Sequence, residues 1–130
     1  MSETRRGSFW LVIGAFALIG PYVGGLTVVL VSLIESPFGS PDWRDFVWLP
    51  VAGLSGYIFG IMPALATGAL SGAISSRVHS KPAWLAISTV VGAGVSALAF
   101  ATVPGSWTYF APVGGVSALA SALVALKVRP

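Results

Sequence analysis

Four long stretches of apolar residues, separated by short polar segments, organise the chain. None of them contains Asp, Glu, Lys, Arg or His. A helix needs about 20 apolar residues to cross the hydrocarbon core of a bilayer, and no stretch alternates apolar and polar positions as a barrel strand does. The pattern therefore predicts an all-α integral membrane protein: one domain, residues 1–130, folded as a bundle of four transmembrane helices. The predicted spans are residues 9–34, 52–76, 83–103 and 109–126.

The second apolar stretch is longer than one straight crossing requires. Residues 48–76 would form a helix of about 43 Å at 1.5 Å per residue. Ser40 and Pro41 are typical of a helix start, as N-cap and first helical residue, and Pro50 interrupts the pattern nine residues later. We therefore predict a short interfacial helix over residues 41–49 ahead of the second span. A single tilted helix with a frayed start is the alternative.

Charged residues are rare, and their placement predicts the topology. Only 8% of the residues are charged and 55% are hydrophobic, whereas an ordinary soluble domain has about 25% charged residues. This excludes a soluble enzyme, a disordered tail and a nucleic-acid-binding module. Because basic residues favour the cytoplasmic ends of membrane helices, we predict that both termini are cytoplasmic. The topology-setting residues are Arg5, Arg6, Arg77, Lys81, Lys127 and Arg129.

All five tryptophans fall at predicted ends of the spans. The indole ring favours the membrane–water boundary, where its ring is apolar and its N–H stays hydrated. We therefore predict five interface anchors: Trp10, Trp43, Trp48, Trp84 and Trp107.

Small residues recur at every fourth position in three of the spans. Lipid gives no hydrophobic drive for helix association, so membrane helices rely on the close approach that small residues allow. These rows predict helix-packing faces, within the chain or between chains. Their members are Gly56, Gly60, Ala64, Gly68, Gly72, Ala93, Ala97, Ala101, Gly114, Ala118 and Ala122.

Prolines and glycines within the spans predict helix breaks. Such breaks resemble the discontinuous helices of transporters, in which freed backbone groups bind substrate; structural kinks are the alternative. The predicted positions are Pro21, Gly24, Gly25, Pro63 and Pro112. A hydroxyl row formed by Thr67, Ser71 and Ser75 either bonds to its own helix or forms a weakly polar path.

The sequence has no constellation that indicates catalysis. The chain has no cysteine, and its one histidine, His79, has no neighbouring ligand or carboxylate, so we predict no catalytic residue, no metal site and no cofactor. The basic residues are divided among several segments, which gives no support for nucleic-acid binding. The polar loop of residues 35–45 is a candidate docking segment for a partner, or a surface loop anchored in the membrane by Phe38 and Trp43.

Two classes of function fit these features. The first is a small, non-catalytic structural, accessory or assembly subunit of the bacterial inner membrane. It would pack through its Gly, Ala and Ser faces against a larger membrane complex or against itself. The alternative is a small transporter or channel for a neutral or apolar solute that uses the helix breaks near Pro21 and Pro63.

The predicted topology is tested by a reporter that is active only in the cytoplasm. Because the basic segments place the C-terminus inside, a reporter fused after Pro130 is expected to be active. The same reporter inserted between residues 36 and 37 should be silent. The opposite pair of results would contradict the predicted orientation.

Overall fold

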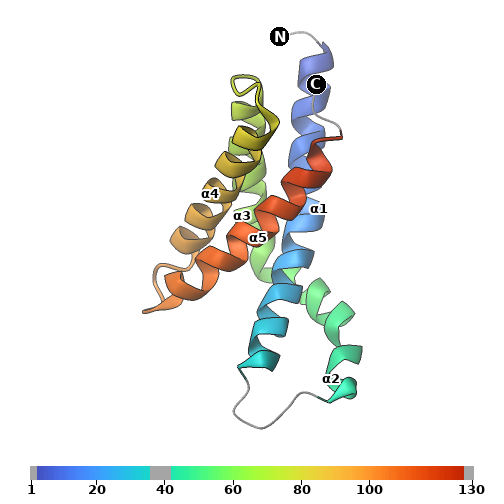
Figure 1. Cartoon of the computed structure of the whole chain (residues 1–130), viewed down its shortest axis with the longest axis vertical. Coiled ribbons are helices and arrows are strands. Elements are labelled where there is room, and N and C mark those ends of the chain that lie inside the picture. Colours follow the sequence, from blue (N-terminus) through green and yellow to red (C-terminus); the bar gives the residue numbers. More distant parts are fainter. Residues whose placement is uncertain (1–2, 36–41, 128–130) are drawn as a thin grey trace.

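The computed structural model describes residues 3–35 and 42–127, which form five helices and no strand (Figure 1). Four of these helices have the length and apolar composition needed to cross a membrane, which confirms the all-helical fold and the number of long apolar helices. The predicted helix start at Ser40 and Pro41, and the basic residue Arg129, lie outside the described residues. The helices are α1 (Glu3–Ile34), α2 (Trp43–Val47), α3 (Leu49–Ser75), α4 (Lys81–Ala99) and α5 (Ser106–Ala125).

The segment before the second long helix contains a short helix, as the pattern predicts, but its bounds differ. The helix α2 has only five residues, and α3 begins at Leu49 rather than at Ala52. Pro50 lies in the first turn of α3, where the missing N–H has no helical partner to lose. Pro50 therefore starts α3 and does not interrupt it.

The turn between α4 and α5 shortens the third predicted span. The helix α4 ends at Ala99, four residues before the predicted end, and Gly105 caps the start of α5 with a φ of 76°. Glycine adopts this left-handed conformation without steric cost. The Ser106 hydroxyl donates a hydrogen bond to the carbonyl of Phe100 and so ties the start of α5 to the end of α4. Ala101, predicted to pack, lies exposed in this turn.

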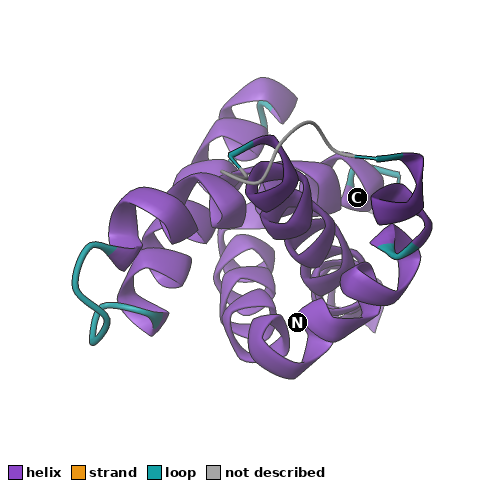
Figure 2. Ribbon diagram, turned by 90° about the horizontal axis from the view of Figure 1, so that it is seen from below, coloured by secondary structure: helices purple, strands orange, loops and turns teal. Residues whose placement is uncertain are grey.

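The four long helices form a ring in which each packs against two neighbours, in the order α1, α3, α4, α5 (Figure 2). The most extensive contacts join α1 to α3 and α4 to α5. The start of α1 and the end of α5 lie at one end of the bundle, which we call the termini end, and α2 lies at the opposite end, the α2 end (Figure 1).

The contact between α1 and α3 is a backbone contact that glycine permits. A Cβ on Gly56 would lie 2.1 Å from the carbonyl oxygen of Pro21 and 3.0 Å from the Cα of Gly25, so no other residue fits there. The predicted row on α3 follows α1 along its length, and it packs within the chain. Gly60 faces Pro21, Ala64 faces Gly20, Gly68 faces Phe16 and Gly72 faces Phe9.

The contact between α4 and α5 uses a different face of α4 from the one predicted. A Cβ on Gly92 would lie 2.2 Å from the Cβ of Ala118, so the two backbones meet there. Gly114, Ala118 and Ala122 of α5 are buried, as a packing face requires. The predicted row at Ala93 and Ala97 is only half-buried and flanks this contact. The central face of α4 instead carries Trp84, Ser88, Gly92 and Ser96, one residue earlier in the helical repeat.

Substitution of Gly56 tests the α1–α3 contact. We expect Gly56→Ala to lower the free energy of unfolding by about 1–3 kcal/mol, because the added Cβ meets a backbone carbonyl that has no room to move. The measurement is reversible unfolding of the purified protein in mixed micelles. The matched control is Gly94→Ala, because a Cβ on Gly94 has no heavy atom within 4 Å. Equal losses in the two variants would contradict the contact.

Candidate functional site

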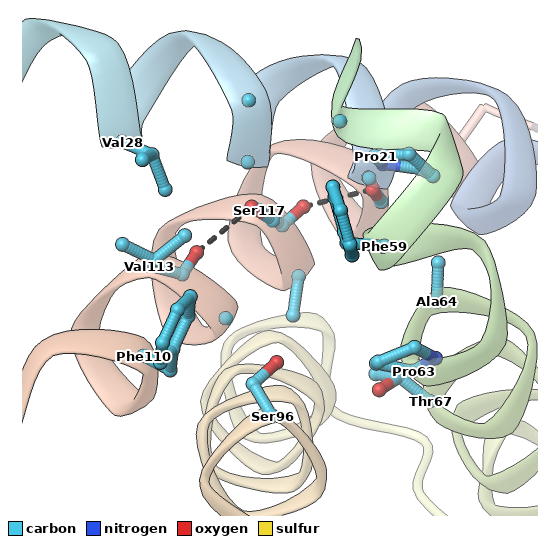
Figure 3. A pocket seen from close by; sticks show the side chains of 18 of the residues that line it. Pro21, Val28, Phe59, Pro63, Ala64, Thr67, Ser96, Phe110, Val113 and Ser117 are labelled. Carbon is cyan, nitrogen blue, oxygen red and sulfur yellow. Dashed lines mark hydrogen bonds between the residues drawn. The ribbon is translucent and has the colours of Figure 1, made fainter. Parts of the chain in front are cut away.

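A cavity of about 420 Å³ lies between the four long helices (Figure 3). This volume is within the range of small-molecule sites. On α1 the cavity wall runs from Phe16 to Val29, which corresponds to about 20 Å along the helix. The wall on α3 runs from Thr67 back to Ser55, so the cavity occupies the half of the bundle toward the α2 end.

Small residues on α1 and α3 line this space. Gly20, Gly24 and Gly25 line the cavity from α1, and Gly56 and Gly60 line it from α3. Gly56 and Gly60 face Pro21 and so allow α1 and α3 to approach, whereas Gly24 faces α5, where an added Cβ would lie 3.0 Å from the Oγ of Ser117. Glycines that permit close helix contacts therefore also line the cavity.

The wall of the cavity is uncharged and mainly apolar. None of the lining residues is ionisable, and its polar side chains are five hydroxyls, those of Ser55, Thr67, Ser96, Ser117 and Ser121. Ser117 and Ser121 donate to the carbonyls of Val113 and Ser117, each at 2.8 Å (Figure 3). Because burial of a charge without a partner costs several kcal/mol, this chemistry fits an uncharged ligand with a large apolar part.

Aromatic side chains form the wall near the α2 end. Phe100, which directly follows α4, stacks on Phe110 of α5 with 4.0 Å between the ring centroids. Phe59 of α3 lines the cavity while 71% of the residue is exposed, so it lies where the cavity opens to the surface. The sequence carried no signal for this group, because the three residues come from three separate segments with no common spacing.

The three prolines lie inside continuous helices, which corrects the predicted helix breaks. α1 runs unbroken through Pro21, Gly24 and Gly25, α3 through Pro63, and α5 through Pro112. A neighbouring helix supplies a hydrogen bond near the first proline: the Tyr57 hydroxyl donates to the carbonyl of Leu18, in the turn before Pro21. Such partners stabilise proline-containing helices in an apolar environment. Pro21 and Pro63 both line the cavity, and Pro112 is exposed.

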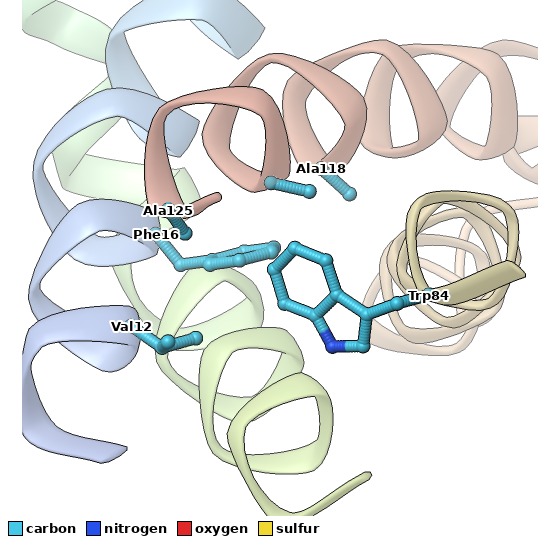
Figure 4. Close-up of a cluster of buried hydrophobic side chains, with 6 residues drawn as sticks. Val12, Phe16, Trp84, Ala118 and Ala125 are labelled. Carbon is cyan, nitrogen blue, oxygen red and sulfur yellow. The ribbon is translucent and has the colours of Figure 1, made fainter. Parts of the chain in front are cut away.

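The termini end of the bundle is closed by a compact apolar core (Figure 4). The ring of Phe16 from α1 lies beside the indole of Trp84 from α4, and Val12 of α1 belongs to the same core (Figure 4). Small side chains of α5 cover these rings, and the members from α5 are Ala118, Ala122 and Ala125. Since Phe16 also lines the cavity, this core forms its floor.

Trp84 departs from its predicted place as an interface anchor. Its side chain is fully buried, and its Nε1 donates a hydrogen bond of 3.1 Å to the carbonyl of Ser71 on α3. The indole therefore joins α4 to α3 inside the bundle. Trp84 shares one face of α4 with Ser88 and Gly92, and all three residues are buried. The other four tryptophans, Trp10, Trp43, Trp48 and Trp107, are each about two-thirds exposed.

The predicted topology-setting and docking residues lie apart from the cavity. Arg77, Lys81 and Lys127 are exposed at the termini end, where α1 also begins with Arg5 and Arg6. His79 is exposed in the turn between α3 and α4. Within the candidate docking loop, residues 36–41 lie outside the described part of the chain. The members of the predicted hydroxyl row Thr67, Ser71 and Ser75 differ in their surroundings. Thr67 and Ser71 are buried, whereas the Ser75 hydroxyl donates a hydrogen bond to the carbonyl of Gly72.

No protein-family model, curated protein or solved structure matches the chain. The chemistry of the site therefore rests on the residues themselves.

Replacement of Trp84 tests the closed core. We expect Trp84→Ala to lower the free energy of unfolding by about 3–5 kcal/mol, because it removes a buried ring and leaves a void. Trp107→Ala, at a residue that is 64% exposed, is the matched control and should change stability by less than about 0.5 kcal/mol. Unfolding followed by circular dichroism measures both. Similar losses for the two variants would show that Trp84 is not a core residue.

Proposed function

We propose that this protein is a small membrane transporter that binds an uncharged, mainly apolar solute in the cavity between its four long helices. The observation that carries the proposal is the cavity itself, which is lined by both Pro21 and Pro63 and has no ionisable side chain. These two prolines are the positions at which the sequence suggested a solute site.

The placement of the protein in the membrane is part of the proposal. Four helices have the length and composition to cross a bilayer, and exposed basic residues gather at the termini end. We infer from the positive-inside rule that the termini end faces the cytoplasm, with the compact, cysteine-free chain in a bacterial inner membrane. The lipid bilayer is then the partner of the many exposed apolar side chains.

The two halves of the bundle support a transport mechanism. In the proposed orientation the cavity lies in the outer half, and the core around Phe16 and Trp84 closes the inner half. Carriers alternate between states that open a central site to one side of the membrane at a time. In the proposed mechanism this conformation is the state that is closed toward the cytoplasm.

The hypothesis of an assembly subunit is less well supported by the geometry. Its motivation was the abundance of small-residue faces available for a partner or a second copy. The row on α3 packs against α1, and the row on α5 packs against α4, so both serve the bundle itself. The small-residue faces therefore support packing of the helices within one chain.

A pocket-filling variant tests solute binding. We expect Val113→Phe to reduce labelling of the protein by a photoreactive diazirine alkane at least tenfold, because Val113 points into the cavity (Figure 3). Val116→Phe on the same helix is the control, since Val116 is 49% exposed and does not line the cavity. Mass spectrometry of the labelled protein in nanodiscs identifies the modified residues.

Transport is tested with the same variants in proteoliposomes. Uptake of a small uncharged fluorescent solute should exceed that of empty liposomes, and Val113→Phe should abolish the excess while Val116→Phe keeps it. Labelling spread evenly over the lipid-facing surface would contradict the proposed site. Labelling inside the cavity without uptake would contradict the proposed transport but would still support binding of the solute in the cavity.

A further inference from the structure

Two hydroxyl groups in the centre of the bundle have no hydrogen-bond partner. The Oγ atoms of Ser71 on α3 and Ser88 on α4 are completely buried and unbonded. A buried polar group without a partner is costly, and in a native protein it calls for a specific explanation. A helical serine ordinarily has a ready solution, because its hydroxyl can bond to the carbonyl one turn earlier.

Other hydroxyls of the described helices take that solution. Thr27, Ser32, Thr89, Ser117 and Ser121 all donate to the carbonyl four residues earlier, at 2.8 to 2.9 Å. The exceptions inside the bundle lie together on α3 and α4. They are Thr67, Ser71, Ser88 and Ser96, which we call the hydroxyl cluster; the Oγ atoms of Ser71 and Ser88 are buried without a partner, and Thr67 and Ser96 line the cavity.

Two contacts join α3 to α4 near the hydroxyl cluster. At one contact, the Trp84 Nε1 bonds to the Ser71 carbonyl. At the next, the Thr67 Cγ2 lies 3.5 Å from the position that a Cβ on Gly92 would take. Ser88 lies on the same face of α4, midway between these two contacts. Ser88 is completely buried at this position.

The hydroxyl cluster adjoins the deep end of the cavity. Thr67, which is only 3% exposed, and Ser96 both line the cavity, and Figure 3 shows their side chains directed into it. Ser71 is one helical turn deeper on α3 and does not line the cavity itself. The cavity thus has a mainly apolar body and a small polar end at Thr67 and Ser96, one helical turn from the unpaired hydroxyl of Ser71.

We propose that the hydroxyl cluster is the polar end of the binding site and takes an uncharged hydrogen-bonding group of the solute. This inference rests on the proposed function and names its ligand class: a molecule with an apolar body and a terminal alcohol, carbonyl or amide. Thr67 and Ser96 bond the group directly. A charged group is excluded, because the cavity wall offers no opposite charge to offset the cost of burial.

The test compares two photoreactive probes that differ only at one end. Both are linear chains of equal length with a central diazirine; one ends in a hydroxyl and the other in a methyl group. For the wild-type protein in nanodiscs, half-maximal labelling of the cavity should require about tenfold less of the alcohol probe, since a paired hydroxyl relieves an unsatisfied group. The double variant Thr67→Val/Ser96→Ala should remove this preference.

Thr89→Val is the matched control, because the Thr89 hydroxyl already donates to the carbonyl of Leu85. It should leave the tenfold preference intact. If the double variant does not fold, Thr67→Val and Ser96→Ala singly should each reduce the preference by about threefold.

The outcomes separate this inference from the proposed function. Equal labelling of the wild-type cavity by both probes would contradict a polar end of the binding site. An unchanged preference in the Thr67 and Ser96 variants would contradict it too. Either result would still be consistent with binding of an apolar solute in the cavity. Absence of cavity labelling by either probe would overturn both.

Stability of the protein without ligand gives a second readout. Ser88→Ala removes an unpaired hydroxyl, so the unfolding temperature should rise or stay constant, and the increase caused by the alcohol probe should shrink. A clear fall in the unfolding temperature without probe would mean that the Ser88 hydroxyl is already paired, contrary to the inference.

Discussion

The approach of α3 to α1 at Gly56 is the constraint on which the rest of the structure depends. Any side chain at this position would meet the carbonyl oxygen of Pro21, so the two backbones touch without intervening atoms. In a membrane this kind of contact replaces the hydrophobic effect, because lipid is as apolar as the side chains it would cover. The register that Gly56 imposes carries Gly68 and Gly72 onto Phe16 and Phe9 along the rest of α1.

The two ends of the bundle differ in the size of the side chains that line them. Toward the α2 end, glycines of both α1 and α3 line the cavity between these helices and the α4–α5 pair. Toward the termini end, the large side chains of Phe16 and Trp84 fill the space between the helices, and the indole N–H donates a hydrogen bond to the carbonyl of Ser71 on α3. One half of the bundle is therefore closed by large rings, and the other remains open to a ligand.

The sequence predicted the helices well because stretch length and charge are properties of single segments. It could not place the central face of α4, because Ala93 and Gly92 belong to rows of similarly small residues; the indole of Trp84 and its acceptor on α3 distinguish them only after folding. The proline positions were visible, but the continuity of α1 through Pro21 depends on its neighbours, among them Tyr57. The cavity belongs to four helices together, and its residues share no spacing.

Disulfide formation between introduced cysteines tests most directly whether the small-residue faces pack within one chain. The chain has no cysteine of its own. A Cβ on Gly20 would lie 3.3 Å from the Cβ of Ala64, and one on Gly115 would lie 3.6 Å from the Cβ of Ala93, both close to disulfide geometry. The pairs Gly20→Cys/Ala64→Cys and Ala93→Cys/Gly115→Cys should each oxidise within a monomer, while Gly20→Cys/Ala93→Cys should not. Disulfides that form only between chains, or in neither of the first two pairs, would contradict the account.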